Sequence, residues 1–158
     1  MVTSIDVQKA GVDSFDAAFR LLERFFREEG FDTPVEEMRV SLRTMLAAPN
    51  ADKEHPSAVF LAWRGREAVG VATVTTCVGI EYGLSAEIDD LYVLPQARGS
   101  GVASALIEAV CNWCSEEGAT VVLVTVTPEG EANHKLLDYY RRRGFSHTGR
   151  VILERALG

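Results

Sequence analysis

The segment VLPQARGSGVAS, residues 93–104, joins the end of an expected strand to the start of an expected helix. Pro95 marks the strand end, and Gly99 and Gly101 stand directly before a run of small residues. A strand that enters a helix in this way points several main-chain N–H groups outward at the positive helix N-terminus. Glycine adopts positive φ and has no Cβ to keep an anion from the backbone. The segment therefore predicts an anion site for a ligand with phosphate groups.

Two well-known phosphate-binding patterns fit this segment poorly. A dinucleotide-binding fingerprint would need glycine or alanine at position 104, where Ser104 stands, and a place near the first strand of a parallel sheet. A P-loop would need Gly-Lys followed by serine or threonine, which this segment lacks. The remaining pattern is Gln96-x-x-Gly99-x-Gly101 with Ala103 after it. A structural turn without a ligand also explains a glycine pair, so both interpretations stay open here.

The rest of the chain predicts a mixed, mostly antiparallel sheet with helices on both faces, an α/β (α+β) fold. Apolar residues at helical spacing predict helices that begin at Ser14 and at Pro34, the second with a capping box of Thr33 and Glu36. The other expected elements are strands over 3–8, 58–63, 68–77, 85–94, 120–126 (buried) and 145–153, helices over 103–118 and 131–143, and a loop over 50–56.

The expected strand over 85–94 has one residue too many for a regular strand. Its apolar residues include Ile88, Leu91 and Val93. Side chains of a strand alternate between the two faces of a sheet, so the odd step from 88 to 91 requires an extra residue. We therefore predict a β-bulge near Asp89-Asp90.

Length and composition indicate one domain over residues 1–158. A chain of 158 residues can bury a single core. No stretch approaches the roughly 18 apolar residues of a membrane span, and acidic residues interrupt the first twenty, so we expect a cytoplasmic protein. The formal charge of −7 opposes binding to nucleic acid.

The cysteines, histidines and arginine run indicate no separate chemistry. Three cysteines are an odd number, and Cys111-x-x-Cys114 lies inside an expected helix, so we expect packing instead of a disulfide, redox or zinc site. The three histidines lack metal-ligand spacing, and no metal is expected. Three arginines, 141–143, suit the negative C-terminus of a helix, although a contact with an anionic ligand stays open.

Two signatures resemble the GNAT superfamily of N-acetyltransferases. The first is the glycine pattern after Leu91-Tyr92-Val93. The second spans 133–145, with Asn133, Tyr140 seven positions later, and Gly-Phe at 144–145. The chain departs from the second signature at Leu136, where the family usually has a small residue. The resemblance implies a GNAT fold and an acetyl-CoA-dependent acyltransferase.

The resemblance also assigns expected roles to particular residues. It implies that the glycine segment holds the pyrophosphate of acetyl-CoA, that the backbone near the bulge holds the pantetheine arm and the thioester carbonyl, and that Asn133 bonds the arm. Tyr140 would be the general acid that protonates the departing thiolate; its alternative role is apolar packing. The expected cofactor-binding residues are Leu91, Tyr92, Val93, Gln96, Arg98, Gly99, Ser100, Gly101, Val102, Ala103, Asn133 and Tyr140.

Carboxylates on the same strand are candidates for the base that deprotonates the acceptor amine. Asp90 and Glu87 rank above Asp89, and solvated carboxylates without a catalytic role remain the alternative. The stretch 88–93 also resembles the matching strand of aminoglycoside 3-N-acetyltransferases, and several acids beside the thioester suit a cationic antibiotic.

Other acceptors and other functions remain open on the sequence alone. A protein N-terminus, a lysine side chain or an amino acid could replace the small cationic acceptor. A CoA-binding sensor or interaction module without turnover is the non-enzyme alternative. The exposed edges of an open sheet are compatible with a homodimer.

Overall fold

The computed structural model describes residues 3–47 and 55–158, which form two compact units. The first unit is Met1–Val124 and the second is Thr125–Gly158. We describe each unit by itself. Among the residues described, no helix has both the length and the apolar character that a membrane crossing requires.

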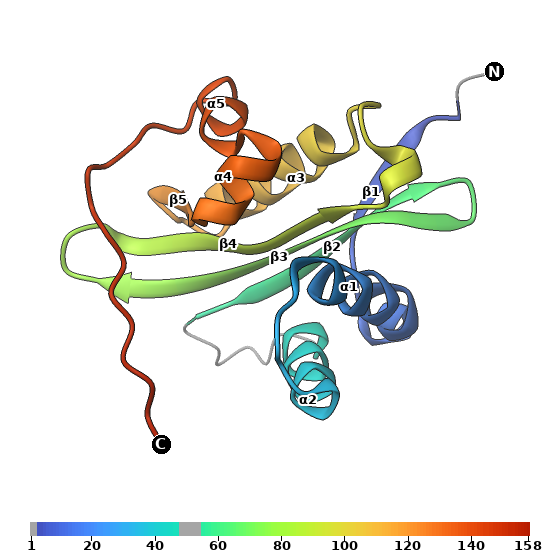
Figure 1. The fold of residues 1–158 in the computed structure, drawn as a ribbon, viewed down its shortest axis with the longest axis horizontal. Coiled ribbons are helices and arrows are strands. Elements are labelled where there is room, and N and C mark those ends of the chain that lie inside the picture. Colours follow the sequence, from blue (N-terminus) through green and yellow to red (C-terminus); the bar gives the residue numbers. More distant parts are fainter. Residues whose placement is uncertain (1–2, 48–54) are drawn as a thin grey trace. The chain divides into compact units, whose positions relative to one another are not determined.

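The first unit is built on a five-stranded sheet in the order β1-β2-β3-β4-β5 (Figure 1). The strands are β1 (Ile5–Lys9), β2 (Ser57–Arg64), β3 (Glu67–Gly79), β4 (Gly83–Val93) and β5 (Val121–Val124). The first three pairings are antiparallel, and β4 and β5 are parallel. Gly65 has a φ of 61° in the turn between β2 and β3, a conformation that glycine adopts without strain. The predicted mixed, mostly antiparallel sheet is confirmed.

Helices cover both faces of this sheet. One face carries α1 (Phe15–Glu29) and α2 (Val35–Leu46), and the other carries α3 (Val102–Glu116) (Figure 1). Leu21 of α1 and Leu106 of α3 are fully buried, which places apolar core on each side. The helix α3 connects the parallel strands β4 and β5, as a crossover between parallel neighbours requires.

The predicted bulge is present in β4. Thr73 of β3 lies opposite Asp90, and the next residue, Val74, lies opposite Ile88, so Asp89 is the extra residue. Residues directly opposite each other in an antiparallel pair share a face of the sheet. The bulge therefore resolves the odd apolar step between 88 and 91.

The second unit contains two short helices in place of the single helix predicted over 131–143. They are α4 (Pro128–His134) and α5 (Leu136–Arg141). Lys135 separates them with a φ of 50°, a left-handed conformation that no helix can continue through. A Cβ at Gly130 would lie 2.9 Å from Cδ1 of Leu136. The large residue at position 136 therefore packs where glycine leaves room for it.

Several local expectations were wrong. The helix α2 starts at Val35 with Pro34 as its N-cap, so Thr33 lies one residue too early and no side chain caps this helix. Ser14 occupies the N-cap of α1 but its side chain makes no capping bond. The edge strand β5 is half-buried, not buried. The loop predicted over 50–56 lies largely outside the described residues.

The strand predicted over 145–153 is absent from the described structure. Residues 145–158 have no helix or strand, and Val151, Ile152 and Leu153 are 82%, 70% and 91% exposed. A β-prone segment becomes a strand only where a neighbouring strand accepts its main-chain hydrogen bonds.

Candidate active site

The glycine turn exposes main-chain N–H groups at the start of α3. Gly99 and Gly101 have φ values of 75° and 85°, and a Cβ at either residue would meet nothing within 4 Å. Gly101 is the N-cap of α3, and Val102 and Ala103 begin its first turn, where N–H groups have no partner four residues earlier. Open space where the side chains of residues 99 and 101 would lie, together with a positive helix end, makes a suitable place for an anion.

Side chains from distant segments hold the glycine turn. Ser100 Oγ donates to the carbonyl of Ala97 at 2.6 Å and accepts a hydrogen bond from Arg64 at 2.8 Å. Arg98 Nε donates to the carbonyl of Val93 at 2.9 Å, and its Nη2 lies 3.3 Å from the carboxylate of Glu28. Arg64 thus adds positive charge beside the turn, whereas the charge of Arg98 is paired with Glu28.

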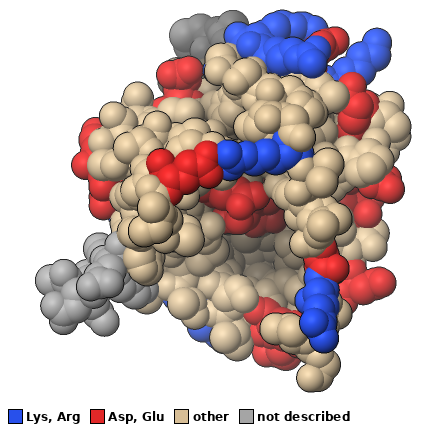
Figure 2. All heavy atoms as spheres, turned by 90° about the vertical axis from the view of Figure 1, so that its left-hand side faces the viewer, with Lys and Arg blue, Asp and Glu red and all other residues tan. Residues whose placement is uncertain are grey.

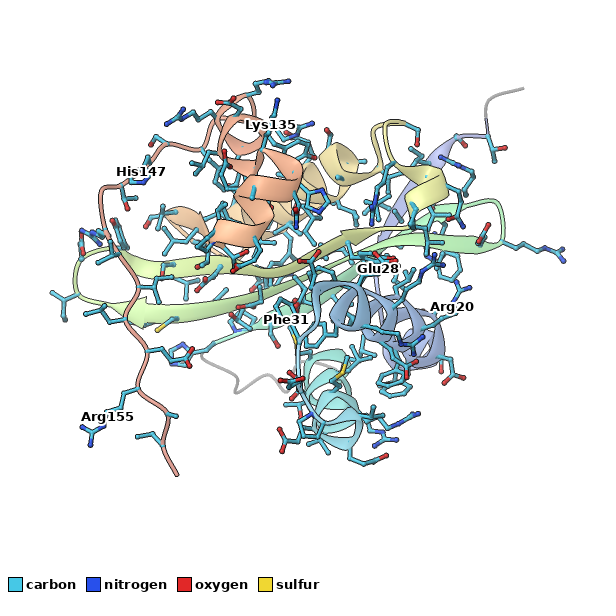
Figure 3. All side chains as sticks on the ribbon, viewed as in Figure 1. Arg20, Glu28, Phe31, Lys135, His147 and Arg155 are labelled. Carbon is cyan, nitrogen blue, oxygen red and sulfur yellow. The ribbon has the colours of Figure 1, made fainter. Side chains whose placement is uncertain are left out.

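Glu28 links this turn to α1. It lies near the end of α1 (Figure 3), accepts a 2.8 Å hydrogen bond from the hydroxyl of Tyr92, and pairs with Arg98. The ring of Tyr92 also stacks on Phe25, with centroids 5.4 Å apart. The Tyr92 side chain therefore packs against α1. Glu28 is a residue of this region that the sequence patterns did not indicate.

One edge of β4 loses its strand partner at the bulge. Pairing with β5 ends at Ile88 opposite Val124, while pairing with β3 continues to Val93. The N–H of Leu94 bonds Val69 of β3, so by alternation the main-chain groups of Val93 and Leu91 point away from β3. From Asp89 to Val93, the side of β4 away from β3 has no strand beside it in the described residues. An extended ligand arm can bond main-chain groups there.

Three carboxylates of β4 lie on the face of the sheet that carries α1 and α2, and the bulge brings Asp89 and Asp90 to this same face. Thr73 donates to Asp90 at 2.5 Å and Thr75 donates to Asp89 at 2.9 Å, so both acids share the face of these threonines. Glu87 lies opposite Thr75 and shares that face by register. In a regular strand, Asp89 and Asp90 would point to opposite faces.

The environment of Asp89 and Asp90 favours their protonated forms. Burial raises the pKa of Asp90, and the hydrogen bond from Thr73 opposes this shift. Burial also raises the pKa of Asp89 to about 6; the Thr75 bond opposes the shift and the charges of Asp90 and Glu87 add to it. Carboxylates with raised pKa values suit proton transfer near neutral pH. Figure 2 shows the acidic side chains on one face of the molecule in red.

Asp90 and Thr73 also line a pocket beneath α1 and α2. Its volume is about 190 Å³. The pocket-lining residues are Phe19, Leu22, Phe26, Thr33, Met38, Ser41, Leu42, Met45, Thr73 and Asp90. Of these, only Asp90 was expected from the sequence. The helical spacing of 19, 22 and 26 indicated only packing. The only other signal was three threonines, at 73, 75 and 76, in an otherwise apolar strand.

Two predicted site residues lie in the second unit. Tyr140 on α5 is buried, and its ring packs against Phe145 at 5.3 Å and Tyr139 at 5.4 Å. Burial raises the pKa of Tyr140 to about 12, and the neighbouring Tyr139 adds to the shift while Arg143 opposes it. A phenol in this environment keeps its proton at neutral pH. Asn133 is exposed near the end of α4, two residues before the left-handed Lys135 labelled in Figure 3.

The cysteines are free thiols. Cys77 is exposed, Cys111 is half-buried and Cys114 is buried in α3. Burial raises the pKa of Cys114 to about 11, so this thiol is a poor nucleophile at neutral pH. The position of Cys114 in α3 agrees with the packing role predicted from the sequence.

Comparison with known proteins gives the family. Residues 15–145 match the Acetyltransferase (GNAT) family. The chain belongs to this family. The GNAT match includes α1, the strands β2 to β5, the glycine turn and the segment that carries Asn133 and Tyr140. The resemblance inferred from the two signatures is thus confirmed.

Two curated relatives of this GNAT chain bear the name aminoglycoside N(6′)-acetyltransferase type 1. The protein from Stenotrophomonas maltophilia is 34% identical over 126 residues, which are 77% of this chain and 74% of that protein. The protein from Salmonella typhimurium is 34% identical over 68 residues, which are 43% of this chain and 45% of that protein. The chain therefore aligns with less than half of the Salmonella relative. The predicted similarity to aminoglycoside acetyltransferases is confirmed, and these names specify the 6′ position, not the 3 position.

Solved structures share the GNAT fold over nearly the whole chain. An integron cassette protein from the mobile metagenome of Cole Harbour Salt Marsh has a TM-score of 0.80 and 29% identity, and covers 96% of this chain and 90% of its own. AAC(6′)-Iy, solved with the bisubstrate analogue CoA-S-monomethyl-acetylneamine, has a TM-score of 0.80, 22% identity and coverage of 98% and 99%. A ribosomal-protein-alanine N-acetyltransferase from Brucella melitensis has a TM-score of 0.73 and 17% identity, and the match covers 97% of this chain and 99% of that protein. Proteins named for different acceptors therefore share this fold.

Proposed function

We propose that this chain transfers an acetyl group from acetyl-CoA to a primary amine of an aminoglycoside, by direct attack of the amine. The observation that carries the proposal is the bulge at Asp89. It coincides with the end of β5 pairing beside the glycine turn, and it turns Asp89 and Asp90 to one face. One extra residue thus accompanies an unpaired edge of β4, which we call the donor edge because acetyl-CoA would bind there, and places two carboxylates on the face where the acceptor amine would bind.

The proposed donor site joins the glycine turn and the open edge of β4. The main-chain N–H groups of the turn hold the diphosphate, and the main chain at Leu91 and Val93 bonds the pantetheine arm and the thioester carbonyl. The main-chain groups of Tyr92 point toward β3 by the same alternation, so the expected contact of Tyr92 with the arm is not retained. Asn133 bonds the same arm. The proposed diphosphate-binding residues are Gln96, Arg98, Gly99, Ser100, Gly101, Val102 and Ala103.

The proposed chemistry needs a base and an acid. The acceptor arrives as an ammonium ion and loses a proton to Asp90 or Glu87, directly or through water. The neutral amine then forms a C–N bond with the acetyl carbon while the C–S bond breaks. Tyr140 donates its phenolic proton to the departing thiolate, which the raised pKa of Tyr140 supports because the group stays protonated.

An aminoglycoside is the acceptor favoured by the relatives and by charge. The three carboxylates Glu87, Asp89 and Asp90 attract a polycation. Curated relatives carry the aminoglycoside name.

We propose that this protein is located in the cytoplasm, because an exposed free thiol such as Cys77 persists in a reducing compartment. A homodimer is also proposed, through the open edges at β1 and β5.

The decisive experiment is a test of acetyl transfer with a panel of amines. The protein is incubated with acetyl-CoA and an aminoglycoside, a peptide with a free N-terminus, a lysine peptide or an amino acid. Free thiol and the mass of the product are measured. We expect release of thiol with the aminoglycoside together with an acetylated product. CoA binding without turnover of any amine would identify a sensor and contradict the enzyme proposal.

Replacing Gly101 by alanine should weaken CoA binding. The positive φ of Gly101 is strained for any other residue, so the turn must shift. Its N–H groups then no longer point toward the diphosphate. We expect about a tenfold higher Kd by calorimetry, which corresponds to roughly one lost hydrogen bond. Gly118→Ala is the matched control, since Gly118 has a φ of 87° and equally open surroundings after the other end of α3. Equal loss of CoA binding in both variants would refute the role of the turn.

Deleting Asp89 should remove the donor edge without unfolding the sheet. Ile88 and Asp90 lie opposite consecutive residues of β3, so the shortened strand can pair regularly. We expect a folded protein by circular dichroism and CoA binding at least about tenfold weaker, equivalent to the loss of one or two main-chain hydrogen bonds. Asp89→Asn, which keeps the extra residue, should bind CoA as the unmodified protein does. Unchanged binding by the deletion variant would show that the bulge has no part in the donor site.

A further inference from the structure

The pocket beneath α1 and α2 has apolar walls and a single carboxylate. Its apolar residues are Phe19, Leu22, Phe26, Met38, Leu42 and Met45. Among the residues that the structure describes, its polar lining consists of Asp90 and the hydroxyls of Thr33, Ser41 and Thr73. A sugar ring carries hydroxyl groups around its rim, and most of them would find no hydrogen-bond partner against such walls. The chemistry of the walls therefore favours an apolar ligand group.

The size of the pocket limits this group to one ring or a short branched chain. The volume is about 190 Å³. An apolar protein cavity of about 150 Å³ is known to hold one benzene molecule. Because the pocket is partly open to solvent, a molecule with several linked rings can place only one of them in this space. A single aromatic ring or a compact alkyl group fits it.

Asp90 gives the pocket one charged contact. Thr73 donates to Oδ2 of Asp90, and Thr73 is itself almost fully buried, so the carboxylate is held in one orientation. Oδ1 remains as the second acceptor of this carboxylate. An ammonium group beside it would form a charge-assisted hydrogen bond. Methionines 38 and 45 adapt their flexible side chains to differently shaped apolar groups.

We propose that this pocket binds a primary amine carried on one compact apolar group, such as an arylethylamine, and that the chain acetylates amines of this class. The inference rests on the proposed acetyl transfer. The ammonium ion gives one proton to Asp90, the amine nitrogen forms a bond with the acetyl carbon, and the C–S bond of acetyl-CoA breaks. The sulfur departs as a thiol with the phenolic proton of Tyr140, the acid of the proposed transfer. The second amine proton leaves to solvent, and Tyr140 regains a proton from solvent.

Phenethylamine and ethanolamine separate the apolar group from the amine. Both are primary amines, and only phenethylamine has a ring to fill the pocket. Calorimetry measures binding of each to the full chain, with and without CoA, and the acetylation assay measures kcat and KM. Because a buried aromatic group contributes roughly a ten- to hundredfold gain in affinity, we expect kcat/KM for phenethylamine to exceed that for ethanolamine by at least about tenfold.

A pair of α2 variants locates the binding site. Ser41→Leu places a larger side chain on the pocket lining, and Thr44→Leu makes the same kind of change at an exposed residue that does not line the pocket. We expect Ser41→Leu to raise KM for phenethylamine about tenfold with little change in kcat, because it removes binding common to substrate and transition state. Ethanolamine kinetics should change in neither variant.

The outcomes distinguish this inference from the proposed function. Phenethylamine binding that Ser41→Leu weakens and Thr44→Leu does not would support the pocket, even if no amine were acetylated and the acetyl-transfer proposal failed. Acetylation of an aminoglycoside such as kanamycin without binding of phenethylamine, in the presence or absence of CoA, would overturn the pocket assignment and leave the proposed function intact. Equal effects of both variants would also overturn it.

Discussion

Replacing Tyr140 by phenylalanine should lower kcat for acetyl transfer by about 10²- to 10⁴-fold, the usual contribution of a general acid. The change removes one hydroxyl and keeps the ring that packs against Phe145 and Tyr139. The departing thiolate then has no positioned proton donor. The Kd for acetyl-CoA should stay nearly constant, because the interaction is made in the transition state. Steady-state kinetics and calorimetry measure the two quantities.

Tyr139→Phe is the matched control for this prediction. Its hydroxyl is buried and has no hydrogen-bond partner in the described structure. Removing an unsatisfied buried hydroxyl is neutral or stabilising. We expect unchanged kcat and an unfolding free energy that does not fall. If Tyr140→Phe kept full kcat, or if both variants lost it equally, Tyr140 would be a packing residue and not the acid.

Replacing Asp90 by asparagine should lower kcat/KM by about 10²-fold or more, as expected for a general base. Asparagine preserves the shape of the side chain, and its oxygen can still accept the hydrogen bond from Thr73. The change removes the charge that takes a proton from the ammonium group. Glu87→Gln is the comparison variant, since Glu87 is the other candidate base, with the same face and the same loss of charge.

The pH dependence decides between these carboxylates. Burial raises the pKa of Asp90, and the base works only as a carboxylate, so kcat/KM should fall as pH decreases through this raised pKa. Asp90→Asn should lose that acidic limb. The pKa of Asp89, now about 6, should move down because one of the charges that raises it has gone. Acidic limbs that match the unmodified enzyme in both variants would exclude Asp90 and Glu87 as bases.

Stability measurements guard against a trivial loss of fold in Asp90→Asn. The folded-state pKa of Asp90 lies above its ordinary value of 3.8, so the folded state holds the proton more strongly than the unfolded state. The free energy of unfolding that Asp90 contributes therefore falls as pH rises from about 4 through the raised pKa. The asparagine variant has no carboxyl group to ionise at this position, so its free energy of unfolding does not show this decrease. Urea unfolding at pH 7 should show a variant at least as stable as the original protein.

The sequence predicted the backbone features of the proposed donor side, the glycine turn and the bulge, better than the surroundings of the proposed acceptor side, because these backbone features are local. Glycines at 99 and 101 adopt positive φ within a few residues of each other, and the odd apolar step at 88–91 requires an extra residue in one strand. Both features follow from backbone geometry and side-chain alternation. They appear in a short stretch of chain whatever packs around it.

Other features depended on contacts between distant segments. The break at Lys135 follows no helix-breaking residue, and the apolar stretch at 151–153 has the composition of a strand without a neighbour to pair with. Glu28 gave no signal, since its partners Tyr92 and Arg98 lie more than sixty residues away. Periodicity can show that a helix has an apolar face, but not what that face contacts.

The sequence by itself therefore determined the order of the elements in the first unit, the glycine turn before α3 and the position of the bulge. Only the tertiary structure decided that Asp89 and Asp90 share one face, and that Asp90 meets Thr73 and the apolar sides of α1 and α2 in a small pocket. The physical reason is that turns and bulges are properties of neighbouring residues. A pocket is the space left where three separate segments pack incompletely, and no single segment encodes it.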